Sequence, residues 1–257
     1  MCFPDGAVPP IDPIAGGALD SERLVLTASD GNRFNAFSAR AARPTGAGIV
    51  IVPDIRGLHP YYEELALRFA EAGIDAVAFD FFGRTAGTAE RGADFDPMGH
   101  AGQTTWAGLQ ADFGAALARL RSADGGAPRS VFVVGFCFGG RFAFDAATLD
   151  AGLAGAIGFY GVLVGWSRND FPTPVEVADR MRCPILGLFG GADRAIGPEA
   201  VTAFDSALSA AHVEHEFVTY PDAPHSFFDR TYEEHAAASA DAWARTLAFI
   251  RTHTAPV

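Results

Sequence analysis

Short apolar runs that alternate with helical stretches constrain the fold of this chain more than any other feature of its sequence. The runs are 48–52, 75–79, 130–135, 155–159, 184–189 and 214–220. They show little polar–apolar alternation, which is typical of strands buried on both faces. Helix patterns occupy 61–72, 101–122, 139–149, 198–211 and 231–252. This alternation predicts an α/β fold with a mostly parallel central sheet and helices on both faces.

The N-terminal region departs from this pattern. Residues 22–40 have the pattern of a β-hairpin with a turn at 30–32, and we expect them to add antiparallel strands at one edge of the sheet. Residues 1–21 are rich in Pro, Gly and Ala, and we expect an arm that lies over the surface. A length of 257 residues suits one domain or two. Because the pattern continues without a linker, we expect a single domain over 22–257.

Composition excludes several classes of protein. The chain is 49% hydrophobic and carries a net charge of −12, and all 19 of its basic residues are Arg. Such a chain lacks the basic face that nucleic-acid binding or an anionic membrane surface requires. No apolar stretch reaches the ~18 residues of a membrane span. Three cysteines cannot all pair within one chain, and no leader pattern opens the sequence, so we expect free thiols in the reducing cytoplasm.

Cys137 lies in the most informative segment, where a strand pattern, the spacing Gly-x-Cys-x-Gly-Gly and a helix pattern follow one another. Glycines at these positions suit a sharp strand-to-helix turn, in which the backbone is strained and closely packed. The nucleophile of α/β-hydrolases stands on such a turn, and the start of a helix favours a thiolate. The alternative is a buried structural cysteine. A dinucleotide-binding turn is excluded because the glycine spacing does not fit.

Candidate partners for Cys137 follow in the chain order nucleophile, acid, base. Asp193 comes after the apolar run 184–189, and His225 comes after the run 214–220. The carboxyl ends of parallel strands build the sites of α/β folds, so we expect the three residues to meet there. Asp193 would orient the ring of His225, which would take the proton of Cys137. The other histidines fit no metal-ligand spacing, and we expect no metal and no cofactor.

The sequence resembles the dienelactone hydrolase (carboxymethylenebutenolidase) family over roughly residues 20–252. The segments that carry the resemblance are 52–57, 80–84, 134–140, 190–193 and 225–227. It implies an α/β-hydrolase fold and hydrolysis of a small enol lactone or ester through an acyl-thiol intermediate.

The resemblance also implies roles for further residues. The backbone N–H groups of Phe138 and Ile55 would hold the oxyanion. Asp54 takes the place of a family glutamate that contacts the resting thiol, with a side chain one methylene shorter. Arg84 takes the place of a family arginine that binds the carboxylate of the substrate.

The second carboxylate-binding arginine of the family comes four residues after the histidine, and here that position is Asp229. A carboxylate would repel an anionic substrate, so the next residue, Arg230, is the remaining candidate. In an acidic chain without lysine, Arg84 and Arg230 are the residues expected to attract an anion.

Several aromatic residues are weaker candidates. Tyr160 follows a strand and would point its hydroxyl into the site. Trp166 and Phe171 lie in an irregular stretch that would cover the pocket, and His100 and Trp106 would line its entrance. For each of them ordinary packing is the more frequent explanation.

The leading hypothesis is a cytoplasmic cysteine hydrolase that acts on a small lactone or ester as a monomer or homodimer. A carboxylesterase without dienelactone activity is the first alternative. A ligand-binding α/β-hydrolase without turnover is the second, which the complete Cys–Asp–His set disfavours.

Overall fold

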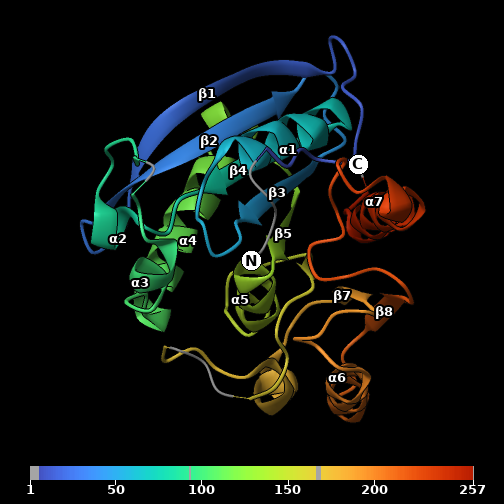
Figure 1. Cartoon of the computed structure of the whole chain (residues 1–257). Helices are drawn as coiled ribbons and strands as arrows, with labels where there is room; N and C mark the ends of the chain where they lie inside the picture. The colour runs from blue at the N-terminus through green and yellow to red at the C-terminus, as the bar shows by residue number, and fades with distance from the viewer. Residues whose placement is uncertain (1–5, 93, 166–168, 257) are drawn as a thin grey trace.

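An eight-stranded sheet runs through the computed structural model, which describes residues 6–92, 94–165 and 169–256 (Figure 1). The strand order is β1-β2-β4-β3-β5-β6-β7-β8. The strands are β1 (Ala18–Thr27), β2 (Arg33–Ala41), β3 (Ala47–Val52), β4 (Ile74–Phe79), β5 (Ser130–Phe136), β6 (Gly155–Phe159), β7 (Ile185–Gly190) and β8 (His215–Tyr220). All six predicted runs form strands within one or two residues of their expected bounds.

The predicted hairpin forms the β1–β2 edge of the sheet. β1 pairs antiparallel with β2, and β2 pairs antiparallel with β4, whereas β3 to β8 pair in parallel. β1 begins at Ala18, three residues before the expected end of the N-terminal arm, because Ala18 pairs with Ala41 across a register shift. The sheet therefore has the mostly parallel arrangement that the sequence predicts.

The five inner parallel strands, β3 to β7, are buried along their whole length. Their continuous apolar sequence follows from this burial, since helices cover both faces. β8 lies at the edge and is only partly buried.

The principal helices form two layers, one on each face of the sheet (Figure 1). They are α1 (Pro60–Glu71), α4 (Trp106–Arg121), α5 (Phe138–Ala146), α6 (Pro198–Ala210) and α7 (Ala236–His253). α1 contacts α7 through the rings of Phe69 and Trp243, with centroids 4.8 Å apart. On the other face, α4, α5 and α6 are joined by the ring pairs Phe113–Phe142 and Phe144–Phe204. Within the described ranges, every helix is too short or too polar to cross a membrane.

Two predicted helices differ from the observed ones in where they begin, and the helix predicted at 139–149 ends at Ala146. The expected helix 101–122 is wrong as a single element: α3 (Pro97–Ala101) ends there and α4 begins at Trp106. The hydroxyl of Thr105 accepts a hydrogen bond from the Gly108 N–H (3.1 Å), so it caps a new helix. The expected helix 231–252 begins later, since a 3-10 turn (Glu233–His235) precedes α7. The sequence also gave no indication of the short helix α2 (Gly83–Ala86) or of the 3-10 turns Ala123–Gly125 and Pro174–Arg180.

Candidate active site

Cys137 occupies the turn between β5 and α5 with backbone angles of φ 54° and ψ −108°. A positive φ is uncommon for a residue with a side chain, and such strain gathers at functional sites. Tyr160, directly after β6, and Ser226, directly after His225, also have positive φ, at 39° and 61°. Three strained residues thus lie at or beside the positions that the sequence selects as a site.

The glycines around Cys137 are required by close backbone packing. A Cβ atom on Gly135 would lie 1.8 Å from the carbonyl oxygen of Gly139. A Cβ atom on Gly139 would lie 2.2 Å from the carbonyl oxygen of Val52, at the end of β3. The turn can therefore press against its neighbours only because these residues lack side chains.

Asp193 and His225 form a hydrogen-bonded pair after β7 and β8. His225 Nδ1 lies 2.6 Å from Asp193 Oδ2, and the side chain of Asp193 is 1% exposed whereas that of His225 is 22% exposed. The other oxygen of Asp193 accepts from the Ala195 N–H (2.8 Å), which fixes the carboxylate. Because a carboxylate only accepts, Nδ1 donates the proton and Nε2 is the basic nitrogen of the ring.

Contacts between strand ends bring these segments to one edge of the sheet. The Cys137 N–H donates to the Phe159 carbonyl (3.0 Å), and the Tyr160 N–H donates to the Leu188 carbonyl (2.8 Å). The ring of Tyr160 lies 5.0 Å from that of His225, centroid to centroid. The ends of β5, β6 and β7 and the His225 loop therefore meet.

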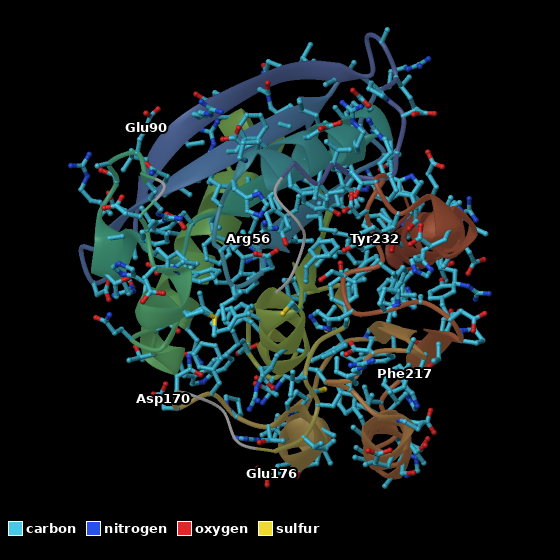
Figure 2. All side chains as sticks on the ribbon, viewed as in Figure 1. Arg56, Glu90, Asp170, Glu176, Phe217 and Tyr232 are labelled. Carbon is cyan, nitrogen blue, oxygen red and sulfur yellow. The ribbon has the colours of Figure 1, made fainter. Side chains whose placement is uncertain are left out.

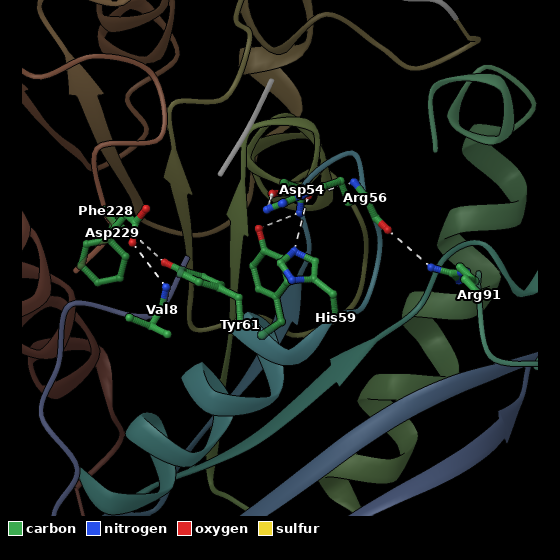
Figure 3. Close-up of polar contacts among 9 residues, drawn as sticks. Val8, Asp54, Arg56, His59, Tyr61, Arg91, Phe228 and Asp229 are labelled. Carbon is green, nitrogen blue, oxygen red and sulfur yellow. Dashed lines mark hydrogen bonds and ion pairs between the residues drawn. The ribbon is translucent and has the colours of Figure 1, made fainter. Parts of the chain in front are cut away.

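Asp54 is fully buried in the loop between β3 and α1, next to Ile55 (Figure 3). Its Oδ1 accepts from the Arg56 N–H (2.8 Å), its Oδ2 accepts from Arg56 Nη2 (3.1 Å), and its own N–H donates to the Tyr62 hydroxyl (2.9 Å). His59 Nε2 lies 3.9 Å from Oδ1. Burial alone would raise the pKa of Asp54, but His59 and Arg56 outweigh it and hold the pKa below its usual value. Arg56 and His59 were not predicted as partners of Asp54.

Arg84 lies in α2, where two carboxylates bind its guanidinium group. Its Nη1 and Nη2 donate to Asp30 at 2.6 and 3.2 Å, and its Nε and Nη2 donate to Asp112 at 3.0 and 2.9 Å. Asp112 is buried in α4 and also accepts from the Asn32 amide (2.9 Å). Arg84 thereby joins α2 and α4 to the β1–β2 turn.

Asp229 and Arg230 hold the N-terminal arm. Asp229 is buried and accepts a hydrogen bond from the Val8 N–H (3.3 Å, Figure 3). It also accepts hydrogen bonds from the N–H and the hydroxyl of Thr231. The Arg230 N–H donates to the Val8 carbonyl (2.9 Å), and its guanidinium donates to the Ile11 carbonyl (2.6 Å). The arm therefore packs along the segment that follows His225.

Phe171 lies in an aromatic group near the turn. Its ring is 5.4 Å from that of Phe138 and 5.8 Å from that of Trp106. Arg141, four residues after Cys137 and not predicted, holds this segment by donating to the Pro172 carbonyl (2.7 Å). His100 lies in α3, stacked on Phe95, and Trp166 falls outside the described residues.

A cavity of about 840 Å³ borders the loop that carries Ile55. Arg56 and His59 line it on that side, and Arg91 and Phe95 line it further away. Figure 2 shows Arg56 near the middle of the view and Glu90, another lining residue, at the upper left. The size lies in the range of small-molecule sites. Among the described residues, no group of three or more His, Cys, Asp or Glu is arranged to hold a metal ion.

The sheet order, the strained turn at Cys137 and the pair after the last two strands define the class of α/β-hydrolases. The sequence profile of the dienelactone hydrolase family matches residues 34–254. A protein of Salmonella typhimurium, provisionally named a carboxymethylenebutenolidase, is 32% identical over 256 residues, which cover 95% of this chain and 94% of the relative. An Escherichia coli K12 protein with the same provisional name is 30% identical over 260 residues, which cover 96% and 95%.

Solved structures agree with this assignment. A Klebsiella pneumoniae protein, provisionally named a dienelactone hydrolase, superposes with a TM-score of 0.78 at 29% identity, covering 90% of this chain and 99% of the other. A dienelactone hydrolase-like promiscuous phosphotriesterase from metagenomic libraries has the same fold, with a TM-score of 0.74 at 23% identity over 93% of this chain and 100% of the other. The chain belongs to the dienelactone hydrolase family and is a hydrolase that acts on ester bonds. The resemblance expected from the sequence is confirmed.

Proposed function

We propose that the chain is a cysteine hydrolase that cleaves a small enol lactone or ester through an acyl-thiol intermediate. In this proposal Cys137 is the nucleophile, His225 is the general base and acid, and Asp193 orients the ring of His225. The observation that carries it is the Asp193–His225 hydrogen bond of 2.6 Å, which lies at the carboxyl ends of the parallel strands, where Cys137 begins a helix. This combination supplies an activated nucleophile. The chain order Cys137, Asp193, His225 is the order typical of the class.

The reaction follows from these roles. His225 Nε2 takes the proton of Cys137 Sγ while the sulfur bonds to the carbonyl carbon. The bond to the leaving oxygen then breaks, its electron pair goes to that oxygen, and the proton returns to it from His225. Water next adds to the thioester while His225 takes its proton. The C–S bond breaks, and the thiol regains the proton from His225.

Two backbone N–H groups are proposed to hold the oxyanion. Phe138 is the first residue of α5, where the helix supplies no acceptor for the N–H group. Ile55 is the second donor. Its loop is ordered by Asp54, which accepts from the Arg56 N–H and whose carbonyl accepts from the Gly57 N–H (2.9 Å). We therefore assign Asp54 to positioning the Ile55 loop, in addition to the contact with the resting thiol that the family resemblance implies.

Chemistry at a thiol also supports a cytoplasmic location, because a reducing compartment keeps the nucleophile unpaired. The proposal needs no cofactor, since side chains supply the nucleophile, the base and the oxyanion donors. The partner is a small molecule, and Tyr160 and Phe171 are proposed to shape its pocket.

The test is hydrolysis of p-nitrophenyl acetate by Cys137→Ala, with Cys183→Ala as the matched control. Cys183 is buried and precedes β7, whereas Asp193 follows the opposite end of that strand. We expect Cys137→Ala to lose hydrolysis with an unchanged circular dichroism spectrum, and Cys183→Ala to keep it. Full activity in folded Cys137→Ala would overturn the assignment. A chain that binds the ester without turning it over would instead be a ligand-binding relative.

A further inference from the structure

The guanidinium of Arg84 is the group that the family resemblance assigns to a substrate carboxylate, and two carboxylates of this chain already bind it. Four of its five N–H donors are used, in one fork to Asp30 and one to Asp112. Asp112 is fully buried, so an anion that drew Arg84 away would leave that carboxylate to the neutral amide of Asn32. A buried carboxylate without its cation is costly, which favours the bound arrangement.

Asp229 takes the place of the second family arginine. It has the opposite charge, and it hydrogen-bonds within the chain. Asp229 is 1% exposed and binds the N–H groups of Val8 and Thr231. Arg230 beside it donates to the Ile11 carbonyl and lies 3.6 Å from Glu64. Both residues therefore tie the N-terminal arm to the segment after His225.

The cavity beside the Ile55 loop is lined by three arginines and three carboxylates, and Cys137, Asp193 and His225 are not among its lining residues. Three arginines line it, and each has a carboxylate partner: Glu63 for Arg23 (2.6 Å), Asp54 for Arg56 (3.1 Å) and Asp80 for Arg91. Glu90 adds a further negative charge to the lining. An anion that entered would compete with these carboxylates within a chain of net charge −12.

The same cavity offers apolar surface. Leu24, Val25, Leu58 and Phe95 contribute to its walls. The guanidinium of Arg91 lies over the ring of Phe95 at 4.6 Å, where it is held by both the ring and Asp80. These walls suit the uncharged body of a ligand better than a carboxylate.

We propose that the substrate is an uncharged ester or lactone with an apolar body, and that Arg84 is a structural tether which does not bind substrate. This inference rests on the proposed function and restricts its substrate class. It departs from the carboxylate binding that the resemblance implies for Arg84, because the two forks occupy that residue.

The experiment compares p-nitrophenyl hexanoate with the p-nitrophenyl monoester of adipic acid. The two acyl groups have equal length and differ by one terminal carboxylate. We expect the wild-type enzyme to favour the hexanoate at least tenfold in kcat/KM, which corresponds to about 1.4 kcal/mol. A smaller ratio, or a preference for the adipate, overturns the inference. If the wild-type enzyme hydrolyses neither ester, the proposed function itself is contradicted.

The variant Arg84→Gln distinguishes a structural role of Arg84 from a role in substrate binding. As a tether, Arg84 has no influence on the hexanoate-to-adipate ratio, while its loss lowers the melting temperature by about 5 °C or more. A selective loss of adipate turnover in Arg84→Gln, with hexanoate turnover retained, overturns the inference. If the variant does not fold, the ratio measured for the wild-type enzyme still decides the substrate class.

Discussion

Two polar clusters at different places in the fold differ in the basic side chain that they contain. Asp193 and His225 form one cluster, and Asp30, Asp112 and Arg84 form the other. Asp193 holds His225 through a single hydrogen bond of 2.6 Å, whereas Asp30 and Asp112 hold Arg84 through four. Arginine keeps its proton at any ordinary pH, so its cluster can only join elements together. Histidine can exchange a proton near neutral pH, so its cluster can take part in a reaction.

The largest expected effect comes from Asp193→Asn. An amide partner favours the wrong ring tautomer of His225, and we expect kcat to fall about 10³–10⁴-fold with little change in fold. The measurement is steady-state hydrolysis of p-nitrophenyl acetate. Asp112→Asn is the matched change in the other cluster, and we expect it to keep kcat within about threefold while the free energy of unfolding falls by about 1–3 kcal/mol. Equal losses of kcat in both variants would remove the distinction between the clusters.

The next effect concerns the backbone at Cys137. Gly135→Ala would place a Cβ atom 1.8 Å from the Gly139 carbonyl oxygen, and we expect a loss of about 4 kcal/mol or more in the free energy of unfolding. Gly114, exposed in α4, has open space around its Cβ position. Gly114→Ala should therefore stabilise the chain by about 0.5–1 kcal/mol in urea unfolding. Two alanine variants of similar stability would contradict the close packing of the turn.

The smallest expected effect concerns the support of the His225 loop by α1. The Tyr61 hydroxyl donates to the Phe228 carbonyl at 2.6 Å within a fully buried site (Figure 3). Tyr61→Phe removes one neutral hydrogen bond, and we expect a loss of about 1 kcal/mol in the free energy of unfolding. We expect kcat to change by less than about threefold. A large fall in kcat without loss of stability would make Tyr61 part of the reaction.

Local patterns predicted the strands and the turn because their causes are local. Apolar runs buried on both faces, and glycines spaced around Cys137, are visible within a few residues of sequence. The break between α3 and α4 was missed although residues 102–105 (Gly-Gln-Thr-Thr) interrupt the apolar spacing. Thr105, a residue type that often begins helices, was the available signal.

The partners of the charged residues could not be predicted because they are distant in sequence. Asp30 lies 54 residues from Arg84, and Val8 lies 221 residues from Asp229. A single sequence does not contain such pairings, so family resemblance gave Arg84 a role for which the structure supplies competing partners. The positions of Cys137, Asp193 and His225 after β5, β7 and β8 were predictable because each of these strands is recognisable from its apolar run.

The central claim is that Cys137 is the nucleophile. Its most direct test is to measure the mass of the protein during turnover of a p-nitrophenyl ester. Rapid acid quenching followed by peptide mass spectrometry should find the acyl group on the peptide that contains Cys137. Cys183 is an internal control, because burial raises the pKa of its thiol to about 12 and keeps it protonated at pH 8. The account predicts an acyl adduct on Cys137 that accumulates when ester is in excess and disappears when it is exhausted. An acyl adduct on another residue, with none on Cys137, would contradict it.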